Sequence, residues 1–143
     1  MLFELVAVFL VLATLGAVTV PFVVPVRQHF AADGAVCRFA LVLRYAQALA
    51  QADQCRLRVR LTDEGAGYVV ERVDAAGCVV QERGSFYGAC GTSNYPADAV
   101  DFAGAAWPLS TGTSTPRAGT FTFGSGSAAH SVVVQLTGRV RCR

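Results

Sequence analysis

The chain has 143 residues, 53% of them hydrophobic, and a formal net charge of +2, which excludes a large multidomain enzyme and a disordered, highly charged protein. The charge is unevenly distributed, and every basic side chain is an arginine. Residues 27–101 hold eight arginines against nine acids, whereas residues 102–143 hold four arginines and no acid.

The first 26 residues, Met1–Val26, are the most apolar part of the chain. Glu4 is the one charged residue among them, and Leu5–Val26 is a charge-free run. As an α-helix this run is about 33 Å long, enough to cross a hydrocarbon core of roughly 30 Å. It lacks the basic start and the short apolar core of a cleaved signal peptide. We therefore expect residues 1–26 to form a transmembrane helix that carries one globular head.

Glu4 and Pro21 give this helix a specific character, because Pro21 follows Glu4 by 17 residues and proline kinks a helix. Residues 2–5 (LFEL) and 13–21 (ATLGAVTVP) resemble the N-terminal helix of type IV pilins and type II secretion pseudopilins. The resemblance implies that the helix sits in the inner membrane until assembly and then packs in the core of a filament. It also implies that Glu4 neutralises the N-terminal amine of an adjoining subunit and that Pro21 kinks the helix.

The orientation of the head depends on a leader that the resemblance implies, a short basic segment ending in Gly ahead of Met1. Arg27, Arg38 and Arg44 all follow the apolar run, and the positive-inside rule alone would place the head in the cytoplasm. The leader would reverse this and place the head in the periplasm. An ordinary signal anchor that carries an extracytoplasmic β domain of unrelated function remains the alternative.

Residues 27–54 continue the N-terminal helix as an amphipathic segment. One apolar stripe with helical spacing runs along it, and Asp33 and Gly34 interrupt the pattern, so the helix either restarts at Asp33 or runs through. Residues 43–50 (LRYAQALA) resemble the end of the first helix in the GspH/FimT branch of the pilin family. The stripe, which we expect to pack on a sheet, consists of Val36, Phe39, Leu43, Ala46 and Ala50.

From Cys55 onward the hydrophobic period changes to two, which predicts an antiparallel β head over residues 55–143. We expect loops and one or two short strands in residues 84–116, with Trp107 in the core. The overall prediction is an α+β fold, a long hydrophobic helix packed on an antiparallel sheet of about six to eight strands, similar to the GspH/FimT domain. The clearest predicted strands are residues 56–61, 68–73, 78–83, 120–123, 131–136 and 139–142.

The five cysteines indicate an oxidising compartment, and their odd number leaves at least one without an intrachain partner. Cys78 and Cys90 would close a short loop, although the spacing leaves the connectivity open. We find no zinc spacing and no nucleophile–base set, so we expect neither a metal, nor a cofactor, nor an enzyme.

The arginines are the candidate binding residues. In a strand Arg139, Arg141 and Arg143 share one face, and guanidinium groups bind phosphate through paired hydrogen bonds. Residues 138–141 (GRVR) resemble the C-terminal Gly-Arg-x-Arg motif with which FimT-type minor pilins take up DNA. A second set with the same alternation is Arg56, Arg58 and Arg60. For both sets the alternative is a solvated strand face whose charges prevent aggregation.

The sequence therefore predicts a minor pseudopilin or minor pilin, a structural subunit of a type II secretion pseudopilus or a type IV pilus. A DNA-binding minor pilin is the alternative. The expected partners are other pilins or pseudopilins, inner-membrane assembly proteins, the inner membrane and, in the alternative, DNA. No small-molecule substrate is expected.

Overall fold

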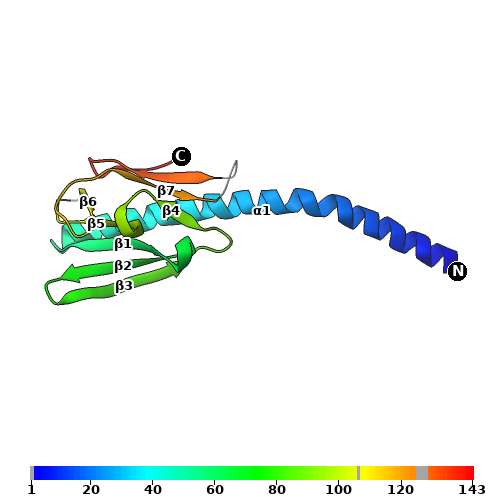
Figure 1. Ribbon diagram of the computed structural model, residues 1–143, viewed down its shortest axis with the longest axis horizontal. Coiled ribbons are helices and arrows are strands. Elements are labelled where there is room, and N and C mark those ends of the chain that lie inside the picture. The colour runs from blue at the N-terminus through cyan, green and yellow to red at the C-terminus, as the bar shows by residue number, and fades with distance from the viewer. Residues whose placement is uncertain (1, 106, 125–128) are drawn as a thin grey trace.

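A computed structural model describes residues 2–105, 107–124 and 129–143, and for residues 2 and 18–22 it describes the backbone alone. One helix, α1 (Leu2–Ala52), dominates the molecule: its N-terminal part projects as a long arm, and its C-terminal part runs into a β head (Figure 1). The helix continues through Asp33 and Gly34, so the run-through alternative is correct. Pro21 lies inside this helix, and the kink at Pro21 remains a prediction.

The C-terminal part of α1 buries the stripe that the sequence predicted. Val36, Phe39 and Leu43 are each at most 1% exposed, because the 3.6-residue period keeps them on one side. Asp33 and Gly34 lie on the exposed side and leave the stripe intact. The helix ends just before Gln54, whose positive φ of 49° turns the chain toward the first strand.

The head contains two antiparallel sheets among the residues that are described. The first has five strands in the order β3-β2-β1-β5-β6, and its first three strands are the consecutive hairpins expected from the sequence. Two 3-10 turns, η1 (Asp63–Gly65) and η2 (Pro96–Asp98), connect strands. The strands of this sheet are β1 (Leu57–Thr62), β2 (Gly67–Asp74), β3 (Gly77–Ser85), β5 (Ala99–Phe102) and β6 (Pro108–Ser110).

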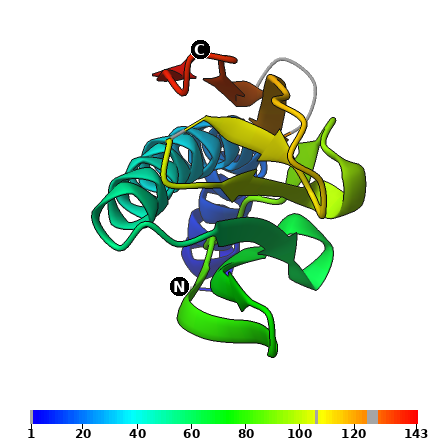
Figure 2. The same cartoon turned by 90° about the vertical axis from the view of Figure 1, so that its left-hand side faces the viewer.

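The second sheet has four strands in the order β4-β7-β8-β9, so β9 is an edge strand. Together with the first sheet this makes nine strands in the described residues, one more than the upper expectation, and residues 84–116 hold three short strands where one or two were predicted. The late and early strands lie on different sides of α1 in both ribbon views (Figures 1 and 2). The strands of this sheet are β4 (Gly91–Ser93), β7 (Gly119–Phe123), β8 (His130–Val134) and β9 (Val140–Cys142).

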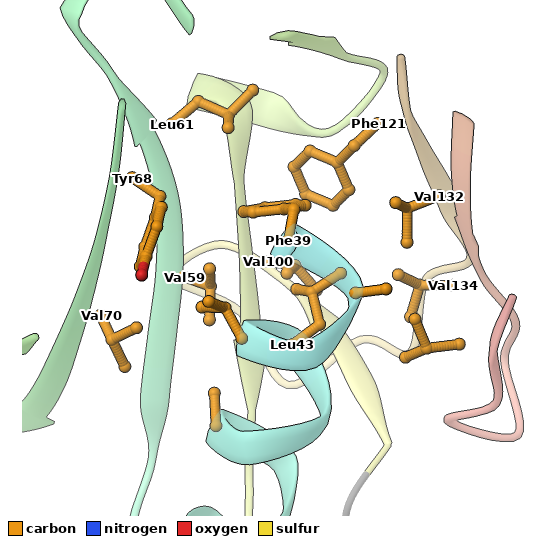
Figure 3. Packing of buried hydrophobic residues seen from close by; sticks show 14 of the residues in the cluster. Phe39, Leu43, Val59, Leu61, Tyr68, Val70, Val100, Phe121, Val132 and Val134 are labelled. Atoms are coloured by element: carbon orange, nitrogen blue, oxygen red, sulfur yellow. The ribbon is translucent and has the colours of Figure 1, made fainter. Parts of the chain in front are cut away.

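Phe39 is the centre of the core. Its ring meets four other aromatic rings edge-on, at centroid distances from 4.8 to 6.3 Å, a geometry that aromatic pairs favour. Because these rings come from both sheets and from the loop after β3, one helical residue joins the whole head. Figure 3 shows Phe39 and Leu43 of α1 between Val59, Tyr68 and Val70 on one side and Phe121, Val132 and Val134 on the other.

Candidate functional site

The N-terminal part of α1 is a large exposed apolar surface, which we call the apolar stem (residues 3–30). Phe3 is 87% exposed and Phe30 70%, although buried apolar side chains are the rule in a folded protein. Contiguous apolar patches of more than a few hundred Å² mark a surface that binds a protein or a membrane. Among the side chains that the structure describes, no helix combines the length and the hydropathy needed to cross a membrane. The large apolar side chains of the stem are Phe3, Leu5, Val6, Val8, Phe9, Leu10, Val11, Leu12, Leu15, Val23, Val24, Val26 and Phe30.

Glu4 lies in the first turn of α1, at the outer end of the apolar stem, and its side chain is exposed. A carboxylate near a helix N-terminus is favoured by the helix dipole. The first turn of α1 lies at the end of the projecting arm, away from the head (Figure 1). The predicted assembly residue is thus exposed at the outer end of the apolar stem, and its role in assembly stays a prediction.

The arginines of β1 and the turn before it converge on one buried acid. Asp101 of β5 is fully buried, and its carboxylate accepts hydrogen bonds from Arg56 Nε at 2.9 Å and Arg58 Nε at 2.8 Å. The backbone N–H of Gly112 donates to the same carboxylate at 3.2 Å. The hydrogen bond to Asp101 raises the pKa of the Arg58 guanidinium. The buried carboxylate of Asp101 is thus paired with two guanidinium groups, and we interpret this cluster as part of the structure of the head.

Arg60, the third residue of this set, is also paired. Its Nη2 atom lies 2.9 Å from Glu71 Oε1 on the neighbouring strand β2. Glu71 is 8% exposed, whereas the Arg60 side chain is 41% exposed. All three arginines of the set therefore point away from the core, as the alternation predicts, and all three are bound to acids of neighbouring strands.

The C-terminal arginines have a different environment. Arg139, Arg141 and Arg143 are exposed, while Val140 between the first two is buried, so the predicted common outer face is present. A tight turn in which Gly138 has a φ of 80° brings β9 back along β8. Within residues 2–105, 107–124 and 129–143, no ion pair or side-chain hydrogen bond involves these three arginines.

The two arginine sets belong to different sheets, β1 to the five-stranded sheet and β9 to the edge of the four-stranded one. The acids that neutralise the first set, Asp101 and Glu71, lie on strands of the first sheet. The four strands of the second sheet carry no acid in their sequence. Among the described residues, the C-terminal arginines thus lie beside a sheet whose strands supply no acid to pair with them.

Trp107 is exposed, so the prediction that it fills the core is wrong. It is 54% exposed and lines a hollow of about 330 Å³ together with Pro116, Leu136 and Thr137. The core is filled from α1, and the short strand β6 that follows Trp107 is at the rim of its sheet. Hydrophobic periodicity could not predict whether Trp107 is buried or exposed, because Trp107 lies in an irregular stretch of the chain.

Two polar contacts tie α1 to the second sheet, and sequence reasoning missed both. His130 Nε2 at the start of β8 lies 3.2 Å from His29 Nδ1, although 101 residues separate them. Arg44 Nη2 donates to the carbonyl oxygen of Val140 in β9 at 3.2 Å. Among the described residues, no group of three or more His, Cys, Asp or Glu side chains is arranged to hold a metal ion.

All five cysteines are unpaired in the structure. Cys78 and Cys90, the candidate pair of the sequence, are not joined, since Cys78 lies near the start of the extended strand β3 and Cys90 lies beyond its far end. At about 3.3 Å per residue, the part of β3 from Cys78 to Ser85 spans roughly 23 Å.

Comparisons with known proteins identify the fold. No family model and no curated protein matches the chain. The type IV minor pilin FimU of Pseudomonas aeruginosa is similar in structure, with a TM-score of 0.66 at 15% identity over 78% of this chain and 87% of FimU. The minor pseudopilin EpsH of the Vibrio cholerae type 2 secretion system gives 0.62 at 13% identity over 78% and 95% of the two chains. The chain thus has the fold of minor pilins and minor pseudopilins, as the N-terminal resemblance predicted.

Proposed function

We propose that this protein is a minor pilin or minor pseudopilin, a structural subunit of a type IV pilus or of a type II secretion pseudopilus. The observation that carries the proposal is the apolar stem, whose large side chains are exposed on a helix that the head leaves uncovered. Before assembly the stem is held in the bacterial inner membrane as a single pass, with the head on the periplasmic side. After assembly it is buried among the stems of other pilins, and the inner-membrane assembly proteins transfer it between these two surroundings.

Glu4 gives the assembled stem its register. A carboxylate inside an apolar filament core costs free energy unless a positive charge pairs with it. The N-terminal amine of an adjoining subunit is the positive group that a bundle of parallel stems brings close to Glu4. Pro21 bends the stem so that it follows its neighbours in the bundle.

The test replaces Glu4 with Ala in the full chain and measures two fractions, membrane-bound protein and protein in sheared filaments. We expect membrane retention to persist and incorporation to fall at least tenfold. Asp53→Ala is the matched control, since it removes an exposed acid at the other end of α1. Incorporation of the Glu4 variant at the level of the control would contradict the role of Glu4.

A DNA-binding minor pilin is the second candidate, and the observation that favours it is the exposed row Arg139, Arg141 and Arg143, which forms no ion pair with the described residues. We leave Arg56, Arg58 and Arg60 out of the interface, because their guanidinium groups are engaged with Asp101 and Glu71. Phosphate contacts of this kind give binding that is independent of sequence and sensitive to salt.

Titration of the full chain in detergent with duplex DNA at several salt concentrations tests this candidate. For Arg139→Ala/Arg141→Ala we expect the slope of log affinity against log salt to decrease by about 2, since each phosphate contact contributes about 0.9. Arg72→Ala/Arg83→Ala removes the same charge from the other sheet and should leave the slope nearly unchanged. Equal losses in both double variants would indicate a general charge effect, and no binding at low salt would rule this candidate out.

A further inference from the structure

Cys37 lies on the flank of α1 that packs against the second sheet. Two contacts define this flank, His29 with His130 and Arg44 with the Val140 carbonyl. Cys37 precedes Arg44 by seven residues, close to two helical turns, so their side chains leave α1 in nearly the same direction. It therefore stands between the two contacts along the helix, with its thiol exposed.

Cys142 lies on β9 with its side chain on the same face as that of Val140. Alternation along a strand places residues 140 and 142 together, and Val140 is buried at 6% exposure. The residue opposite Cys142 on β8 is Val132, which is fully buried. The Cys142 side chain is thus directed toward the helix side of the sheet, whereas the side chain of Arg141 is directed away from it.

The register of the two strands brings the cysteines to the same level along α1. His130 at the start of β8 marks the level of His29, and the pair Val134 and Val140 marks the level reached by Arg44. The pair Val132 and Cys142 lies midway between these two levels. Cys142 also contributes, after desolvation and Asp33, to raising the pKa of the Cys37 thiol, an electrostatic effect that requires the two groups to be near each other.

We propose that Cys37 and Cys142 form a disulfide that fastens the C-terminal strand β9 to α1. The oxidant is a disulfide, either of a thiol–disulfide oxidoreductase in the protein's compartment or of a small molecule such as oxidised glutathione. One cysteine thiolate attacks that disulfide and forms a mixed disulfide, and the second cysteine then displaces the oxidant's remaining thiol. The two cysteines lose two electrons and two protons, and the oxidant is reduced to two thiols.

The remaining cysteines have no comparable partner. Cys55 is half-buried against the core, Cys78 lies at the hairpin end of β3, and Cys90 lies beyond the opposite end of that strand.

The disulfide between Cys37 and Cys142 would also stabilise the position of β9. β9 is an edge strand of three residues that pairs on one side with β8, and on its other side Arg44 binds a single carbonyl. A covalent link at Cys142 would hold β9, which carries Arg141 and is flanked by Arg139 and Arg143.

The experiment uses the full chain in detergent, reduced completely and then oxidised with oxidised glutathione. Alkylation followed by intact-mass measurement counts the thiols that remain. We expect oxidation to consume two thiols and to produce, after chymotrypsin, a cross-linked pair of peptides that contain Cys37 and Cys142. Because the closed loop is long, we also expect the melting temperature of the oxidised protein to exceed that of the reduced protein by about 10 °C or more.

Two single variants make the assignment specific. Cys37→Ser should form no cross-link, so any thiol that it loses carries a glutathione adduct in the intact mass, and its melting temperature should be the same with and without reductant. Cys90→Ser, the matched control, should still lose two thiols and keep the oxidised increment in melting temperature. A cross-link between other cysteines, or loss of the cross-link in Cys90→Ser alone, would overturn the proposal, as would five thiols remaining after oxidation. None of these outcomes depends on filament assembly or on DNA binding.

Discussion

Two segments of this chain share one pattern, RLRVR at Arg56–Arg60 and RVRCR at Arg139–Arg143, and have opposite environments. In both, alternation directs the arginines away from the core. The first segment is bound to Asp101 and Glu71 on neighbouring strands, and the second has no such acid beside it in the described residues. The comparison teaches that local sequence sets the face on which a charged side chain lies. The fold decides whether an acid of a neighbouring strand neutralises that charge or leaves it open to a ligand.

Of the substitutions that test this difference, removal of the buried acid Asp101 should have the largest effect on the free energy of unfolding. Asp101→Asn keeps the size of the side chain and eliminates the charge that Arg56 and Arg58 share. We expect the free energy of unfolding to fall by about 3 kcal/mol, since breaking a buried pair leaves uncompensated charge. Urea denaturation of the full chain in detergent, followed by near-ultraviolet circular dichroism of the aromatic core, measures the change.

The control for this measurement is Asp74→Asn. Asp74 pairs with Arg72 at 3.2 Å, and the two side chains are 46% and 42% exposed. Exposed pairs contribute little, and we expect a loss under about 0.5 kcal/mol. Similar losses in the two variants would mean that burial of Asp101 does not distinguish its ion pairs.

Glu71→Gln should have an intermediate effect. Glu71 is buried, yet its partner Arg60 remains in contact with water, so solvation compensates the arginine in part. We expect the free energy of unfolding to fall by about 1 kcal/mol in the same urea assay. Glu64→Gln, on the exposed turn η1, is the control and should have no measurable effect. A loss as large as that of Asp101→Asn would indicate that Arg60 is held as tightly as Arg58.

The sequence was sufficient to predict features that depend on residues close to one another along the chain. The stripe through Val36, Phe39 and Leu43 is buried as its spacing predicts, and the three early strands form the expected hairpins. These features follow from periods of 3.6 and two residues, which are visible in a short window. The N-terminal resemblance likewise led to the correct fold, because Glu4 and Pro21 have a fixed spacing.

Features that depend on distant neighbours could not be predicted. Asp101 meets Arg56 across 45 residues because β5, and not a sequence neighbour, pairs with β1. Trp107 was assigned to the core although no periodicity placed it there or on the surface, and it is 54% exposed. The division of the nine described strands into two sheets around α1 likewise decides which arginines have acids beside them.

The smallest expected effect is at the centre of the second segment. Arg141 pairs through its backbone with Val133 on β8, and its exposed side chain forms no ion pair with the described residues. We expect Arg141→Ala to change the free energy of unfolding by less than about 0.5 kcal/mol, because substitutions at such surface positions are nearly neutral. Arg58→Ala, the equivalent position in the first segment, should be clearly destabilising in the same urea assay, since it leaves the buried Asp101 with one guanidinium fewer. If both variants were equally stable, the ion pairs of β1 would not contribute to folding, and the two segments would differ in geometry alone.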